Sequence, residues 1–191
     1  MKSSRLEAFS DGVLAIIITI MVLELKAPHS ADIDALRPLV PSLLTYLLSF
    51  IYIGIYWNNH HHLLHATPRV NGAIMWANLN LLFWLSLVPF FTAWLGENHS
   101  APWPAALYGG VLLMAAISYT ILQATIVAHL GSDSKLAQSL GSDLKGRLSI
   151  LLYIAGIGLA WLHPTISDLL YIGVALMWVI PDRRARVAAE E

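Results

Sequence analysis

The chain has 191 residues, of which 57% are hydrophobic and only 12% are charged, and its formal net charge is −1. A soluble domain carries about 25% charged residues, so this composition excludes an ordinary soluble fold and indicates an integral membrane protein. The absence of cysteine excludes disulfides, thiolate chemistry and cysteine-ligated zinc. No basic cluster is large enough to indicate a nucleic-acid partner.

Apolar stretches of spanning length recur along the whole chain, separated by polar or proline-containing segments. They predict an all-α integral membrane protein with six transmembrane helices and no separate soluble domain. The predicted spans are about 6–25, 42–65, 70–95, 103–129, 144–162 and 165–180, within a single domain over 1–191. Asn71, Asn78 and Asn80 fall inside the third span, and we expect them to contact other helices.

The basic residues are distributed unevenly between the two sides of this predicted bundle. The N-terminus, the second and fourth loops and the C-terminus hold nine of the 11 Lys and Arg residues, Arg183, Arg184 and Arg186 among them, and the other loops hold only Lys26 and Arg37. By the positive-inside rule, both termini are predicted to be cytoplasmic, in a bacterial or archaeal cell membrane. The opposite side is acidic and would concentrate cations.

The first span is unusual because charged residues lie close to both of its ends. About 12 uncharged residues separate Asp11 from Glu24, whereas a lipid-facing span needs roughly 20, so its ends should meet protein and water. At about 100° per residue, Ile16, Ile20 and Leu23 form one stripe, and Asp11 lies roughly 140° from Ile16. Ordinary bundle packing is the alternative explanation of such a stripe.

The segment Arg5-x-x-x-Phe9-Ser10-Asp11, followed by the Ile-rich helix, resembles the signature of the transmembrane protein 175 family of potassium channels in its prokaryotic single-repeat form. The chain also lacks the Thr-Val-Gly-Tyr-Gly filter of conventional potassium channels, as that family does. The resemblance implies a homotetramer in which four first helices line a central pore.

By the same resemblance, rings of aliphatic side chains form the pore constriction, which would consist of Ile16, Ile20 and Leu23. Thr19 would be the polar residue beside the permeating ions, and Glu24 would lie at the outer mouth. The motif residues would anchor the pore helix to its neighbours; they are Arg5, Phe9, Ser10 and Asp11.

A histidine-rich cluster, residues 57–65, lies at the cytoplasmic end of the second span, at the depth of Ser10 and Asp11. Polar groups at that depth should satisfy one another, so we expect Ser10 and Asp11 to bond to this cluster. The candidate partners are Trp57, Asn58, His61, His62 and His65. His61 and His65 have a spacing that can bind a metal, but no second histidine box exists on that side, so no metal, cofactor or enzymatic activity is expected.

The sequence therefore predicts a potassium-conducting cation channel with a hydrophobic gate, whose partners are monovalent cations, the lipid bilayer and further copies of the chain. The alternative is a small proton- or ion-coupled secondary transporter that uses Asp11 and the His60–His65 cluster. We find no inverted repeat of the kind that such transporters contain.

Overall fold

The computed structural model describes residues 2–131, 133–140 and 143–179, and these residues fold into helices. The elements are α1 (Ser3–Leu23), the 3₁₀ helix η1 (Ile33–Leu39), α2 (Val40–His65), α3 (Gly72–Ser86), α4 (Val88–Glu97), α5 (Pro102–Leu130), α6 (Lys135–Leu140), α7 (Leu144–Leu159) and α8 (Pro164–Val179). The described residues contain one isolated β-bridge, between Lys2 and Arg69, and no strand. Arg183, Arg184 and Arg186 lie outside the described residues.

Four helical segments among the described residues are long and apolar enough to cross a membrane: Ser3–Leu23, Ile33–His65, Gly72–Glu97 and Pro102–Leu130. They correspond to the first four predicted spans. The helices in the place of the last two spans, α7 and α8, have 16 residues each, which is about 24 Å of helix against a hydrocarbon core of about 30 Å. The chain is therefore an all-helical, multi-pass membrane protein.

The third predicted span contains a break between two helices. α3 ends at Ser86 and α4 begins at Val88, with Leu87 between them. Pro89 lies in the first turn of α4 and has no N–H group to donate to the carbonyl of Leu85, so the helical ladder is interrupted at this point.

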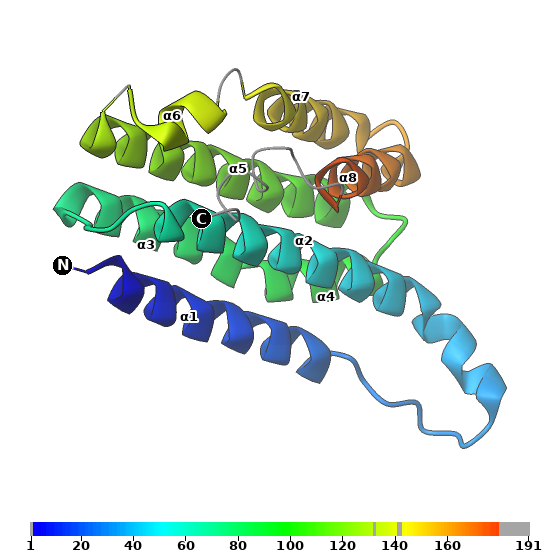
Figure 1. Cartoon of the computed structure of the whole chain (residues 1–191). Helices are drawn as coiled ribbons and strands as arrows, with labels where there is room; N and C mark the ends of the chain where they lie inside the picture. The colour runs from blue at the N-terminus through cyan, green and yellow to red at the C-terminus, as the bar shows by residue number, and fades with distance from the viewer. Residues whose placement is uncertain (1, 132, 141–142, 180–191) are drawn as a thin grey trace.

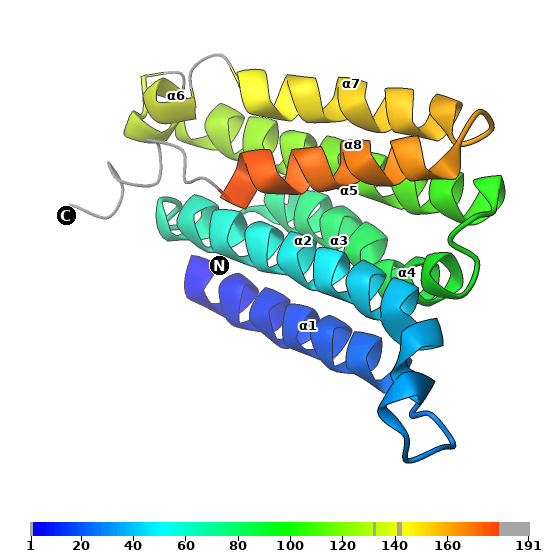
Figure 2. The ribbon, with the colours of Figure 1, turned by 90° about the vertical axis from the view of Figure 1, so that its right-hand side faces the viewer.

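α1 lies along one edge of the molecule, and α7 and α8 lie on the far side of α2 from it (Figures 1 and 2). α1 packs against α2, α3 and α4, while α5 packs against α3, α4, α7 and α8. Figure 2 shows α1 and α2 running side by side in opposite directions. This edge position leaves one long face of α1 without a covering helix.

Candidate functional site

The uncovered face of α1 carries the aliphatic stripe that the sequence singles out. The side chains of Ile16, Ile20 and Leu23 are 60%, 42% and 74% exposed within the single chain. Thr19 is exposed on the same face, and its hydroxyl donates to the carbonyl of Ala15 at 2.8 Å. An adjacent face of the helix is buried against the bundle through Leu6, Ser10, Leu14, Ile17 and Met21.

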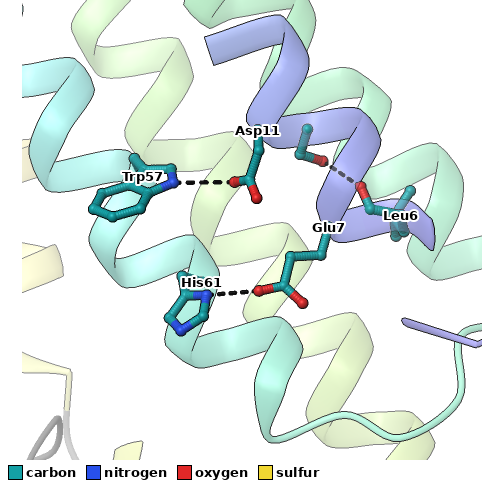
Figure 3. Close-up of polar contacts among 6 residues, drawn as sticks. Leu6, Glu7, Asp11, Trp57 and His61 are labelled. Carbon is teal, nitrogen blue, oxygen red and sulfur yellow. Dashed lines mark hydrogen bonds and ion pairs between the residues drawn. The ribbon is translucent and has the colours of Figure 1, made fainter. Parts of the chain in front are cut away.

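A third face of α1 forms two parallel polar contacts with α2 (Figure 3). The Trp57 indole Nε1–H donates to Asp11 Oδ1 at 3.0 Å, and His61 Nδ1 lies 2.6 Å from Glu7 Oε1. Each pair is four residues from the other on both helices, which is the spacing at which two antiparallel helices present neighbouring side chains. Asp11 thus points sideways to α2 and away from the aliphatic stripe.

Ser10 has a different partner from the one that we expected. Its hydroxyl donates to the carbonyl of Leu6 at 2.9 Å and accepts a hydrogen bond from Asn78 Nδ2 of α3 at 3.0 Å, so the expected bond to the second span is wrong. Adjacent helical residues are about 100° apart, so Ser10 faces α3 while Asp11 faces α2. Only the arrangement of the neighbouring helices decides which partner each residue meets.

The bond to Ser10 extends into a chain of buried polar groups that joins three helices. Asn78 Oδ1 lies 2.6 Å from His60 Nε2, and Ser10, His60 and Asn78 are all buried. Because Asn78 uses its amide nitrogen to donate to Ser10, its oxygen must accept, and His60 must carry its proton on Nε2. The hydrogen bonds therefore run in one direction, from α2 through α3 to α1.

The remaining predicted site residues lie around these contacts. His65 is exposed and its ring stacks on that of His61 with a centroid separation of 5.8 Å, while Asn58 is exposed and His62 is half-buried. Arg5 and Phe9 are exposed, on the same face of α1 as the aliphatic stripe. Within the described residues, no group of three His, Asp or Glu side chains is placed to hold a metal ion.

Glu7 is not among the predicted site residues, although the sequence carries a signal for it. Glu7 precedes Asp11 by four residues and therefore shares its helix face, just as His61 follows Trp57 by four. The expected contacts of the third-span asparagines are confirmed, because Asn80 donates to Ser118 of α5 and Asn71 lies 3.3 Å from His129 Nδ1 of α5.

At the other end of α1, an ion pair joins the segment that follows the helix to α4. Lys26 Nζ lies 2.8 Å from Glu97 Oε1, and the pKa of Lys26 is raised above its ordinary value by the hydrogen bond and the charge of Glu97. This pair and Glu24 border a groove of about 700 Å³ between α1 and α4, which Ile16, Ile20 and other side chains line. The acidic groups thus lie where the aliphatic stripe ends.

Comparisons with known proteins agree with this arrangement. Residues 5–89 match the family model described as endosomal/lysosomal potassium channel TMEM175. A protein of Chryseobacterium sp. named potassium channel HX13_20290 is 52% identical over 191 residues and covers 100% of both chains. A zebrafish protein named endosomal/lysosomal proton channel TMEM175 is 26% identical over 134 residues, which are 67% of this chain but 25% of that relative.

The fold has a solved counterpart as well. The crystal structure of a lysosomal potassium-selective channel TMEM175 homolog from Chamaesiphon minutus superposes with a TM-score of 0.82 at 31% identity, over 93% of this chain and 96% of that one. Fold and sequence together place the chain in the class of multi-pass ion-channel proteins, and not among enzymes. It belongs to the TMEM175 family, which confirms the resemblance seen in its first helix.

Proposed function

We propose that this chain forms a potassium-conducting cation channel in which the first helices of four copies surround a central pore. The observation that carries the proposal is the uncovered face of α1, where Ile16, Ile20 and Leu23 are exposed while the other faces are held by α2, α3 and α4. The names of the Chryseobacterium and Chamaesiphon relatives support potassium as the conducted ion. A homotetramer would bring four copies of the stripe around one axis.

In this proposal the stripe forms a hydrophobic gate. Rings of aliphatic side chains offer an ion no ligands, so conduction requires the rings to open far enough to stay wet, and narrow rings close the pore by dewetting. Thr19 is the polar group on this face that permeating ions would pass. The carbonyl end of α1 and Glu24 would favour cations at the outer mouth.

The same proposal includes the topology that the basic residues predict. Lys2, Arg5 and Arg69 lie at one end of the bundle, since the Lys2–Arg69 bridge joins the N-terminus to the loop between α2 and α3. That end would be cytoplasmic, α7 and α8 would complete six spans, and the protein would reside in a bacterial or archaeal cell membrane. Asp11 and Ser10, bonded to α2 and α3, would anchor the pore helix, while Arg5 and Phe9 would face the neighbouring copy.

The test is ion efflux from proteoliposomes loaded with potassium, sodium or a proton gradient, with the wild type compared with Ile16→Asn. A polar ring stays wet at a narrower radius, so the variant should leak faster and select less. We expect efflux on the order of tenfold faster, equivalent to a barrier lower by about 1.4 kcal/mol. Unchanged efflux would place the constriction elsewhere.

The matched variant in the same assay is Asp11→Ala. It removes the acceptor of the Trp57 hydrogen bond on the side of α1 that faces away from the stripe. We expect fewer conducting assemblies and unchanged ion preference. A changed preference would mean that Asp11 faces the permeating ions, and a proton flux without potassium flux would overturn potassium as the conducted ion.

A further inference from the structure

The isolated β-bridge holds two cationic residues against each other at one end of the bundle. Lys2 directly precedes α1, and Arg69 lies in the loop between α2 and α3. Residues that face each other in an antiparallel pair have Cβ atoms about 4.5–5.5 Å apart on the same side, and like charges at these positions repel. Both residues are exposed, so their charged groups reach the surface together.

Neither residue takes part in an ion pair within the described part of the chain. The ion pairs there are Lys26–Glu97, Arg37–Asp34 and Glu7–His61, and none includes Lys2 or Arg69. Arg5 adds a third exposed positive charge in the first turn of α1. That turn contains no acidic residue and no side-chain cap, so the positive end of the helix dipole points toward the same region.

We propose that Lys2 and Arg69 bind the phosphate headgroup of an anionic membrane lipid. A phosphate between Lys2 and Arg69 would convert the repulsion into two attractive contacts, with Arg69 able to bind it through two parallel N–H groups. The site lies at membrane-interface height, because the apolar part of α1 begins at Leu6 and exposed Trp76 lies about one turn into α3, seven residues after Arg69. The inference does not depend on which ion the protein conducts.

The bound lipid would also hold the start of α1 against the loop between α2 and α3. This contact lies at the same end of the helix as the Glu7–His61 and Asp11–Trp57 pairs (Figure 3). Anionic lipid would therefore stabilise the position of the helix that carries the aliphatic stripe, from the end opposite to the Lys26–Glu97 ion pair.

The test titrates purified full-length protein in detergent with dioleoylphosphatidylglycerol, dioleoylphosphatidylcholine or inorganic phosphate, and measures thermal stability and the number of lipids retained in native mass spectrometry. We expect phosphatidylglycerol alone to stabilise and to be retained. The double variant Lys2→Gln/Arg69→Gln should weaken its apparent affinity by about fivefold for each charge removed, or about 25-fold in all.

Two control variants locate the effect. Arg147→Gln removes an exposed charge from α7, at the same end of the bundle as Lys2 and Arg69 in the proposed topology. Arg37→Gln removes an exposed charge from η1, at the other end. Both variants should bind phosphatidylglycerol with wild-type affinity. Equal loss in Arg147→Gln would mean a diffuse attraction and would overturn the site. Equal stabilisation by inorganic phosphate would overturn a lipid as the ligand, as would wild-type affinity in the double variant.

Discussion

At the scale of single residues, the buried polar chain His60–Asn78–Ser10 shows how one side chain can fix the orientation of three helices. Asn78 donates to Ser10 of α1 and accepts from His60 of α2, while its own backbone belongs to α3. Each buried polar group in a membrane protein needs such a partner, because no water is present to replace it. Rotation of α1 about its axis would break the bond to Ser10 and leave Asn78 without its acceptor.

Asn78→Ala should therefore destabilise the protein. It leaves Ser10 and His60 without their partner, and we expect a loss of about 1–2 kcal/mol, which corresponds to a lowering of the melting temperature by roughly 2–8 °C. Thermal unfolding followed by size-exclusion chromatography measures it. The control is Asn58→Ala, which truncates an exposed asparagine and should change stability by less than about 0.5 kcal/mol. Equal losses in the two variants would argue against a special role of the buried chain.

At the scale of helices, the side of the bundle away from α1 depends on close contact between α5, α7 and α8. The buried ring of Tyr171 on α8 lies against Gly109 of α5 and Gly156 of α7, and its hydroxyl donates to the carbonyl of Ala105 at 3.1 Å. A Cβ atom added at Gly109 would collide with the Tyr171 hydroxyl. These two glycines let α5 and α7 pack closely against the Tyr171 ring of α8.

Gly109→Ala and Gly110→Ala form a matched pair for this contact. The first should destabilise the bundle by about 1–3 kcal/mol through overpacking, because Tyr171 has to move. The second adds the same methyl group where nothing lies within 4 Å, and it should be neutral or stabilise the helix by up to about 1 kcal/mol. Melting temperatures of the two variants measure the difference, and a more stable Gly109→Ala would contradict the packing.

At the scale of the whole molecule, the decisive feature is the place of α1 at the edge of the bundle (Figure 1). Its polar contacts to α2 and α3 fix which face turns inward, and the aliphatic stripe is what remains outside. A membrane helix with one face uncovered in this way can be completed by further copies of the same chain, arranged around a common axis.

The natural absence of cysteine allows a direct test of this arrangement. Leu23→Cys places a thiol on the exposed stripe, where we expect an oxidant to join neighbouring copies into a band of twice the 21.0 kDa chain mass on a denaturing gel. Met21→Cys places the thiol on the buried face, with 1% exposure, and should stay monomeric. Cross-linking of Met21→Cys alone would mean that the face of α1 buried here meets the other copies.

Much of this description follows from local sequence. Composition and the length of the apolar stretches are enough to identify an all-helical membrane protein, and the motif from Arg5 to Asp11 is enough to identify the family, because both depend only on neighbouring residues. The 3.6-residue period of a helix also separates Asp11 from the Ile16 stripe, so the direction of Asp11 away from the stripe could be predicted.

The partners of the individual side chains were decided only by tertiary structure. Sequence placed Ser10 at the depth of the histidine cluster, but the packing of α3 against α1 gives it Asn78 instead, and the same packing pairs Glu7 with His61. The bridge between Lys2 and Arg69 likewise joins residues that are 67 positions apart. Helix periodicity fixes which residues share a face, whereas only the rotation and neighbours of the packed helices determine what that face meets.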